Sequence, residues 1–121
     1  MLKNLLMQEQ IHKRFFKLRP FEQQLLKVII QKASTQNQLP AFWVDLSFTT
    51  VHQLMGSHYP QALAEQQIVK SLEALLFARG YFHATDHASL EYQFIGGYKI
   101  NPDVSIRVYL NLLIQPYLMQ L

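Results

Sequence analysis

Cations gather near the N-terminus at a spacing that suits phosphate binding. Lys13, Arg14, Lys17 and Arg19 fall within one short stretch. Seven Lys or Arg residues and two Glu residues occupy positions 1–32, a formal charge of +5, whereas positions 33–121 carry four cations and six acids, a formal charge of −2. Concentrated positive charge attracts phosphate or an acidic partner, although a solvated helix face has the same composition. Both interpretations stay open at this point.

Other chemistries find little support in the residue types. The chain has no cysteine, which excludes disulfides, thiolate zinc sites, iron–sulfur clusters and cysteine nucleophiles. His83 and His87 are four apart but are separated by Thr85-Asp86, which is typical of a turn, so we interpret the histidines as structural or exposed. No nucleophile elbow or phosphate-cradling glycine loop is present. We therefore expect no catalytic residue, no metal, no cofactor and no small-molecule substrate.

Length and composition predict one folded domain. The chain has 121 residues, half of them hydrophobic and 16% charged. This balance supports a packed core and argues against disorder. No apolar run approaches the roughly 18 to 20 residues of a membrane span. Because the N-terminus also lacks the pattern of a signal peptide, we expect a cytoplasmic protein without membrane contact.

Helical periodicity dominates the first two thirds of the chain. Pro20 suits the first turn of a helix, Ser47 or Thr49 can cap another helix, and Gly56 and Gly80 suit the positions after helix ends. The expected elements in chain order are a helix over 3–17, a helix over 20–33, a strand over 42–46, a short helix ending at Met55, and a helix over 61–79.

The period changes after Gly80. Apolar and polar residues alternate from Val104 to Leu110, which predicts a strand with one buried face. A partner strand is expected from Tyr92 to Ile100, with a bulge or bend at Gly96-Gly97, and the turn chemistry of Asn101-Pro102-Asp103 joins the two strands into a hairpin. A last short helix is expected over 116–121. The order predicts an α+β winged helix-turn-helix with four to five helices, a C-terminal β-hairpin wing and a short extra strand.

The chain also resembles a family, the N-terminal winged-helix domains of iteron-type plasmid replication initiator (Rep) proteins. The resemblance spans roughly residues 16 to 121 and rests on the order of several segments. They are Phe16–Leu26, Leu46–Gly56, Ile68–Leu75, the wing Gly97–Val108, and the proline-tyrosine-leucine ending in Leu113–Leu121. In that family a second winged-helix domain follows and carries much of the specific reading of the DNA. The resemblance thus implies one domain over 1–121, either the N-terminal half of a longer initiator or a stand-alone relative.

The resemblance implies binding to double-stranded DNA at plasmid origin repeats. Helix-turn-helix proteins place the N-terminal residues of the second helix near base edges, and a wing can grip backbone phosphates. Glu73 on the exposed helix face favours the alternative of an ordinary solvated helix. The candidate DNA-binding residues are Lys13, Arg14 and Lys17 in the basic cluster, Ser57, His58, Tyr59, Gln61, Gln67 and Lys70 at the second helix, and Lys99 and Arg107 in the wing.

Apolar surface predicts a protein partner as well. Phe42-Trp43-Val44 and Val108-Tyr109-Leu110 offer more hydrophobic area than one small core needs, and we interpret Phe15 and Phe16 as core or dimer contacts. Homodimerisation agrees with what the resemblance implies. The alternative function is a protein-interaction winged helix that does not bind nucleic acid, which the small net charge of +3 favours.

Overall fold

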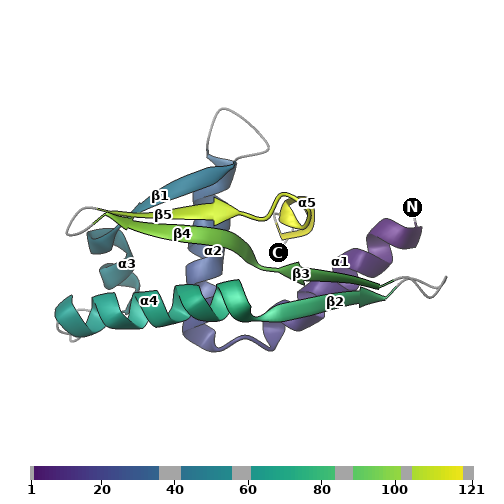
Figure 1. The fold of residues 1–121 in the computed structure, drawn as a ribbon, viewed down its shortest axis with the longest axis horizontal. Helices are drawn as coiled ribbons and strands as arrows, with labels where there is room; N and C mark the ends of the chain where they lie inside the picture. Colours follow the sequence, from purple (N-terminus) through teal and green to yellow (C-terminus); the bar gives the residue numbers. More distant parts are fainter. Residues whose placement is uncertain (1, 36–41, 56–60, 84–88, 102–104, 119–121) are drawn as a thin grey trace.

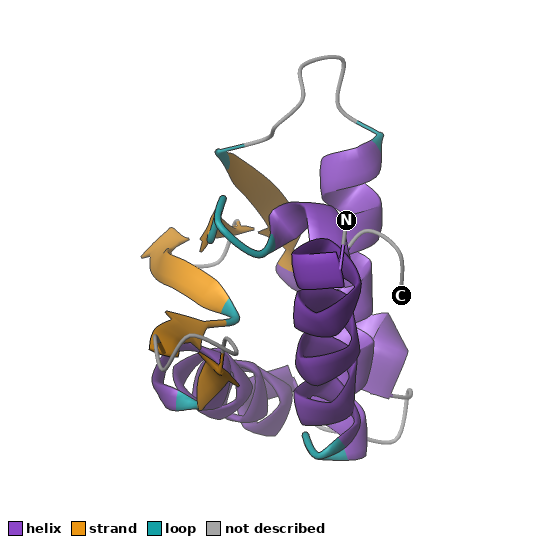
Figure 2. Cartoon of the chain, turned by 90° about the vertical axis from the view of Figure 1, so that its right-hand side faces the viewer, coloured by secondary structure: helices purple, strands orange, loops and turns teal. Residues whose placement is uncertain are grey.

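The computed structural model describes residues 2–35, 42–55, 61–83, 89–101 and 105–118. Within these ranges the chain forms five helices, a three-stranded antiparallel sheet and a two-stranded antiparallel sheet (Figure 1). Figure 2 shows the strands gathered along one side of the molecule and the helices filling the rest. The expected α+β winged helix-turn-helix is confirmed. No helix in the described ranges is long and apolar enough to cross a membrane.

The first two helices form the N-terminal half of the core. Helix α1 runs over Leu2–Phe16 and helix α2 over Pro20–Ser34, each within a residue of its expected position. Pro20 opens α2, and the backbone N–H of Arg19 donates to Glu22 Oε2 at 3.2 Å. This bond satisfies one backbone donor at the helix entrance. Buried apolar side chains then follow at helical spacing: Leu25, Leu26, Ile29 and Ala33.

Helices α3 and α4 form the helix-turn-helix. Helix α3 runs over Phe48–Met55 and α4 over Gln61–Phe77. Ser47 caps α3, because its Oγ accepts the backbone N–H of Thr50 at 3.1 Å. The expected Gly56 terminus and the candidate residues Ser57, His58 and Tyr59 lie outside the described residues.

The expectation that α4 continues to Arg79 was wrong. Helix α4 ends at Phe77, and Arg79–His83 forms strand β2, which pairs with β3 (Ser89–Gln93). Helical and extended patterns are hard to separate where apolar residues run continuously, and Gly80 was misinterpreted as a helix terminus. Gly80 instead allows close packing, because a Cβ at this position would overlap the ring and hydroxyl of Tyr92 across the strand pair.

The expected long strand from Tyr92 to Ile100 is two strands. Strand β3 ends at Gln93, and β4 covers Ile95–Asn101. Phe94 interrupts them, and its side chain is buried in the core. The ladder between β4 and β5 shifts register between Ile95 and Gly97, which places the expected bulge at Gly96.

The winged part is the three-stranded sheet, with the strand order β1-β5-β4. Strand β1 covers Trp43–Ser47 and β5 covers Ser105–Leu110, and both neighbours of β5 are antiparallel to it. Val44, Leu46, Ile106 and Val108 point to the core, so alternate residues form the outer face of the sheet. The hairpin β4–β5 is the expected wing.

The last helix, α5, is shorter than expected and covers Gln115–Leu118. Residues 119–121, which were expected to continue it, lie outside the described ranges. The Nε2 atom of His12 in α1 lies 3.2 Å from the backbone oxygen of Tyr117. This contact joins the two ends of the chain against one core.

Candidate nucleic-acid interface

The basic cluster lies where α1 ends and α2 begins. Lys13 and Lys17 are exposed, and Lys13 pairs with Glu9 one turn earlier at 3.1 Å. Such an exposed pair contributes little to stability and leaves the ammonium group accessible. Lys27 of α2 joins this corner, since its Nζ lies 5.8 Å from the ring centroid of Phe15 in α1. We call Lys13, Lys17 and Lys27 the basic corner.

Hydrogen bonds hold the basic corner in a fixed shape. The Nε2 of Gln23 donates to the backbone oxygens of Leu18 at 2.8 Å and Phe16 at 3.3 Å, which ties α2 to the end of α1. Phe15 is fully buried, so its predicted core role is confirmed, whereas Phe16 is 65% exposed. The corner thus carries cations beside one exposed aromatic ring.

Arg14 has a different position from its neighbours. It is half-buried, its Nε donates to the backbone oxygen of Arg79 at 3.3 Å, and its guanidinium lies 5.9 Å from the ring centroid of Phe94. These contacts attach α1 to strand β2 and to the core. Arg14 therefore has a structural task in the fold that Lys13 and Lys17 do not share.

The candidate residues on α4 have mixed surroundings. Gln67 is half-buried, and its Nε2 lies 3.5 Å from Ser71 Oγ on the same helix. Lys70 is exposed, and Glu73 follows it three residues later on the exposed side. A carboxylate beside a cation lowers the local attraction for phosphate. Gln61 begins α4, but its side chain lies outside the described part of the structure.

The two wing cations lie on the outer face of the sheet. Register places Asp45, Arg107 and Lys99 in one row across β1, β5 and β4. Arg107 binds both carboxylate oxygens of Asp45, at 3.0 and 3.2 Å, and its guanidinium stacks 3.8 Å from the ring centroid of Trp43. The bond to Asp45 raises the pKa of Arg107 above its ordinary value. Lys99 is exposed and is the wing cation nearest to the open edge of β4.

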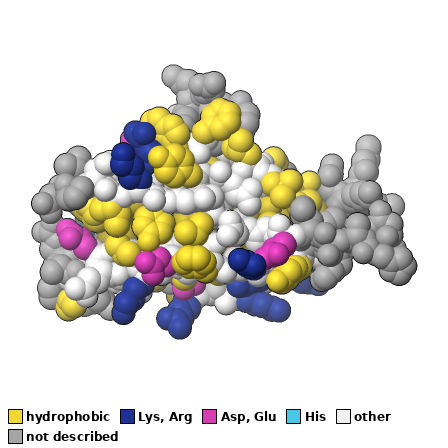
Figure 3. Space-filling model, in the orientation of Figure 1, with side chains coloured by type: hydrophobic (Ala, Val, Ile, Leu, Met, Phe, Trp, Pro, Cys, Tyr) yellow, Lys and Arg dark blue, Asp and Glu magenta, His cyan; other side chains and the backbone are white. Residues whose placement is uncertain are grey.

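Aromatic side chains occupy the neighbouring row. Trp43 pairs with Tyr109, which pairs with Gly97, so the β4 residue opposite Tyr109 has no side chain. Trp43 is 41% exposed and Tyr109 39%, and Phe42 is also exposed. Figure 3 shows hydrophobic side chains gathered over this face, with cations along the lower margin of the molecule. We call Trp43 and Tyr109, together with the exposed Phe42 that precedes β1, the aromatic row.

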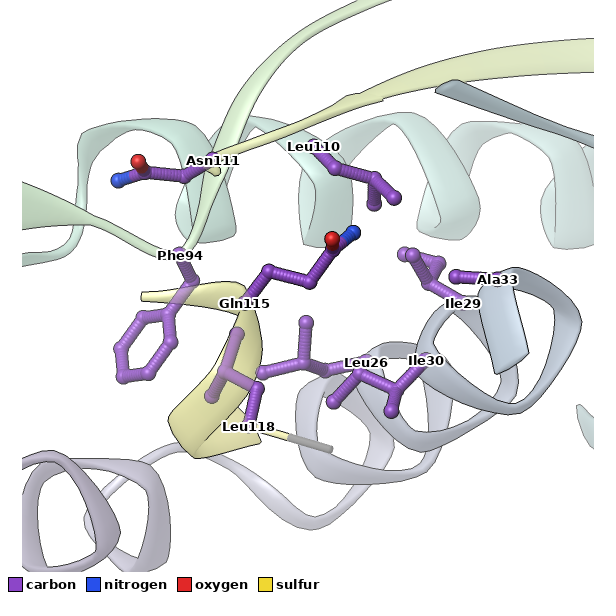
Figure 4. A pocket seen from close by; sticks show the side chains of 9 residues that line it. All are labelled: Leu26, Ile29, Ile30, Ala33, Phe94, Leu110, Asn111, Gln115 and Leu118. Atoms are coloured by element: carbon purple, nitrogen blue, oxygen red, sulfur yellow. The ribbon is translucent and has the colours of Figure 1, made fainter. Parts of the chain in front are cut away.

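A small cavity lies inside the core and not at the basic corner or the aromatic row. Aliphatic residues of α2, Phe94 and Leu118 line it, and the carboxamide of Gln115 extends among them (Figure 4). Its volume is about 10 Å³, which is the size for one water molecule. The cavity is too small for an organic ligand.

Sequence reasoning missed Lys27 and Asp45 as members of these surfaces. Lys27 meets α1 only through tertiary packing, which no local pattern reveals. Asp45 did leave a signal, because strand alternation places it on the same face as Trp43.

The comparisons with known proteins bear on the fold. No family model and no curated protein matches the chain. Among solved structures, the chain is similar to the X-ray crystal structure of the MSBI1.176 WH1 domain, a replication protein isolated from a multiple sclerosis patient. The TM-score is 0.72 at 9% sequence identity, over 93% of this chain and 89% of that chain. The chain therefore has the winged-helix fold of this replication-protein domain.

Proposed function

We propose that the chain is a DNA-binding and dimerisation domain of a plasmid replication initiator, and that it holds duplex DNA mainly through backbone phosphates. The supporting observation is the basic corner on a winged-helix fold whose solved neighbour is a domain of a replication protein. Lysines act as point charges that neutralise phosphates without selecting a base sequence. The expected binding is therefore strong at low salt and weakly sequence-dependent.

The basic corner is the best candidate for the phosphate contacts. Lys13, Lys17 and Lys27 are exposed, and Lys27 also lies over the ring of Phe15, whereas Arg14 holds α1 against β2. Lys70 and Lys99 remain candidates for further contacts from α4 and the wing. Arg107 is occupied by Asp45 and Trp43, so we assign it to the outer face of the sheet instead.

Fluorescence anisotropy with a labelled duplex tests this proposal across a range of salt concentrations. Replacing Lys13, Lys17 and Lys27 together by glutamine should weaken binding and reduce the log–log salt slope by about 2 to 3, since each neutralised phosphate contributes about 0.9. The double variant Lys70→Gln/Lys99→Gln measures the contribution of the further candidates on α4 and in the wing. Equal losses per charge removed in the two variants would show that net charge alone governs binding. Absence of binding to the wild-type chain at low salt would favour the protein-interaction alternative.

We also propose that a second copy of the chain covers the aromatic row. Exposed aromatic rings on one sheet face form the kind of apolar patch that marks partner sites. Sedimentation equilibrium tests this. Tyr109→Ser should shift the chain from dimer to monomer, because Tyr109 lies opposite Trp43 in the row. Tyr81→Ser is the matched control, since Tyr81 is similarly exposed but lies in the separate β2–β3 sheet. A monomeric wild-type chain would contradict dimerisation.

A further inference from the structure

A surface pocket lies where helix α4 passes the start of α3 and the end of β4. Its volume is about 560 Å³, which is within the range of pockets that hold an organic group. Phe48, Val69 and Ile100 form an apolar lining, and Glu65 and Glu73 contribute carboxylates from α4. Figure 3 shows acidic side chains beside hydrophobic ones over α4 and β4. We call this surface the acidic pocket.

The carboxylates of the acidic pocket lie on either side of an apolar residue. Glu65, Val69 and Glu73 follow one another at four-residue intervals along one side of α4. The two glutamates are about 12 Å apart along the helix axis, and the valine is midway between them. The hydroxyl of Tyr98 donates to Glu73 Oε1 at 3.2 Å, which holds this carboxylate beside β4. Lys70 also lines the pocket, so two carboxylates and one ammonium group leave a net charge of −1.

The basic corner has the opposite arrangement of charge around an apolar group. Phe16 ends α1, and its side chain is 65% exposed. Its ring meets the buried ring of Phe15 edge-on, with centroids 5.2 Å apart. Lys13 precedes Phe16 by three residues and Lys17 follows it directly, and both lysines are exposed. An exposed ring between two cations therefore complements a pocket whose apolar lining lies between two carboxylates.

We infer that the acidic pocket of one copy of the chain binds the basic corner of a second copy. Phe16 of the second copy packs on the apolar lining, and its two neighbouring lysines pair with the two glutamates of α4. The lysines are about 6 Å apart at helical rise, and their flexible four-carbon side chains can spread toward carboxylates about 12 Å apart. Burial of one phenylalanine removes about 150 to 250 Å² from water, which supplies most of the attraction.

The contact joins two unlike surfaces of the chain. It is a head-to-tail contact, so it differs from a two-fold dimer in which one patch meets itself, and it does not involve the aromatic row. Nucleic acid is a poor occupant of the acidic pocket, because the net negative charge repels phosphate. The contact engages two lysines that the proposed function assigns to phosphates. A copy held in this way cannot use them to hold a duplex.

Sedimentation equilibrium of the Tyr109→Ser chain tests the inference, because this background removes contact through the aromatic row. We expect weak association that falls as salt is added. Adding Phe16→Ser should weaken the association about tenfold or more, since burial of the ring is lost. Adding Tyr81→Ser instead is the matched control. Tyr81 is 53% exposed and lies in the β2–β3 sheet, outside both surfaces, so the association should stay unchanged.

Reversal of charge tests whether these two surfaces meet each other. In the same background, Lys13→Glu/Lys17→Glu and Glu65→Lys/Glu73→Lys should each stop self-association, because like charges then face each other across the contact. An equimolar mixture of the two variants should associate again, because each copy then meets a partner of opposite charge.

The inference is overturned if the Tyr109→Ser chain remains monomeric at low salt and about 1 mM protein. That result would leave the proposed dimer through the aromatic row intact, so the two failures are distinguishable. Association that survives Phe16→Ser, or charge-reversed variants that remain apart when they are mixed, would overturn the inference as well.

Discussion

Tyr92→Phe should stabilise the protein, which is unusual for a substitution in a core. Tyr92 is 3% exposed, and its hydroxyl is buried without a hydrogen-bond partner among the described residues. Its ring meets Phe94 edge-on, with centroids 5.9 Å apart, and its end lies against Gly80. Phenylalanine keeps the ring contacts and removes the buried hydroxyl of Tyr92.

The size of the effect follows from the desolvated hydroxyl. A buried polar group without a partner costs about 1 to 3 kcal/mol, and the lost packing of one oxygen atom returns a small part of this. We expect the free energy of unfolding to rise by about 1 kcal/mol, which raises Tm by about 4 °C for a domain of this length. Urea denaturation and thermal melts followed by circular dichroism measure both quantities.

The dependence of stability on pH in the alkaline range gives an independent check on the same hydroxyl. Burial raises the pKa of Tyr92 above 10, and the nearby Arg14 opposes this only in part. The unfolded chain therefore loses this proton first. The free energy of unfolding of the wild-type chain therefore keeps its full value below about pH 10 and falls as the pH rises through the folded-state pKa. The advantage of Tyr92→Phe should therefore grow as the pH rises above about 10.

Tyr81→Phe, at a side chain that is 53% exposed, is the matched control and should change stability by less than about 0.5 kcal/mol. A Tyr92→Phe protein that melts below wild type at neutral pH would refute the reasoning, because the hydroxyl would then have a favourable partner.

Three other substitutions test the packing and the sheet face. Gly80→Ala should cost about 1 to 3 kcal/mol, because the new Cβ overlaps Tyr92; an unchanged Tm would contradict the close approach. Asp45→Asn should cost less than about 1 kcal/mol, since its pair with Arg107 is partly exposed, and urea denaturation at low and high salt measures this. Phe15→Ala should cost about 3 to 5 kcal/mol, because Phe15 is fully buried; a loss below 1 kcal/mol would place its ring outside the core.

Local patterns predicted the elements that local chemistry determines. Pro20 sets the start of α2, Ser47 caps α3, and the alternation through Arg107 predicts the C-terminal end of β5 at Leu110. Strand β2 was missed because its existence depends on pairing with β3, and no short-range signal marks that partner. Phe94 has the residue type of a strand, and only tertiary packing turns its side chain into the core and ends β3.

The candidate surfaces, too, were predictable only where residues close in the sequence form them. The charge of the basic corner was visible in the sequence, since Lys13 and Lys17 are neighbours along the chain. Its completion by Lys27 was not visible, because that contact depends on how α1 and α2 pack. The pairing of Arg107 with Asp45 joins residues 62 positions apart, which explains why the sequence alone presented Arg107 as an available wing cation.

The placement of charge argues for a division of tasks over this fold. Positive charge lies on α1 and α2, outside the helix-turn-helix, while α4 presents Glu65 and Glu73 around its exposed lysine. A helix with this charge pattern is poorly suited to base readout in a major groove, where basic and amide side chains make most contacts. Phosphate contacts at the basic corner would hold a duplex in place without reading its sequence.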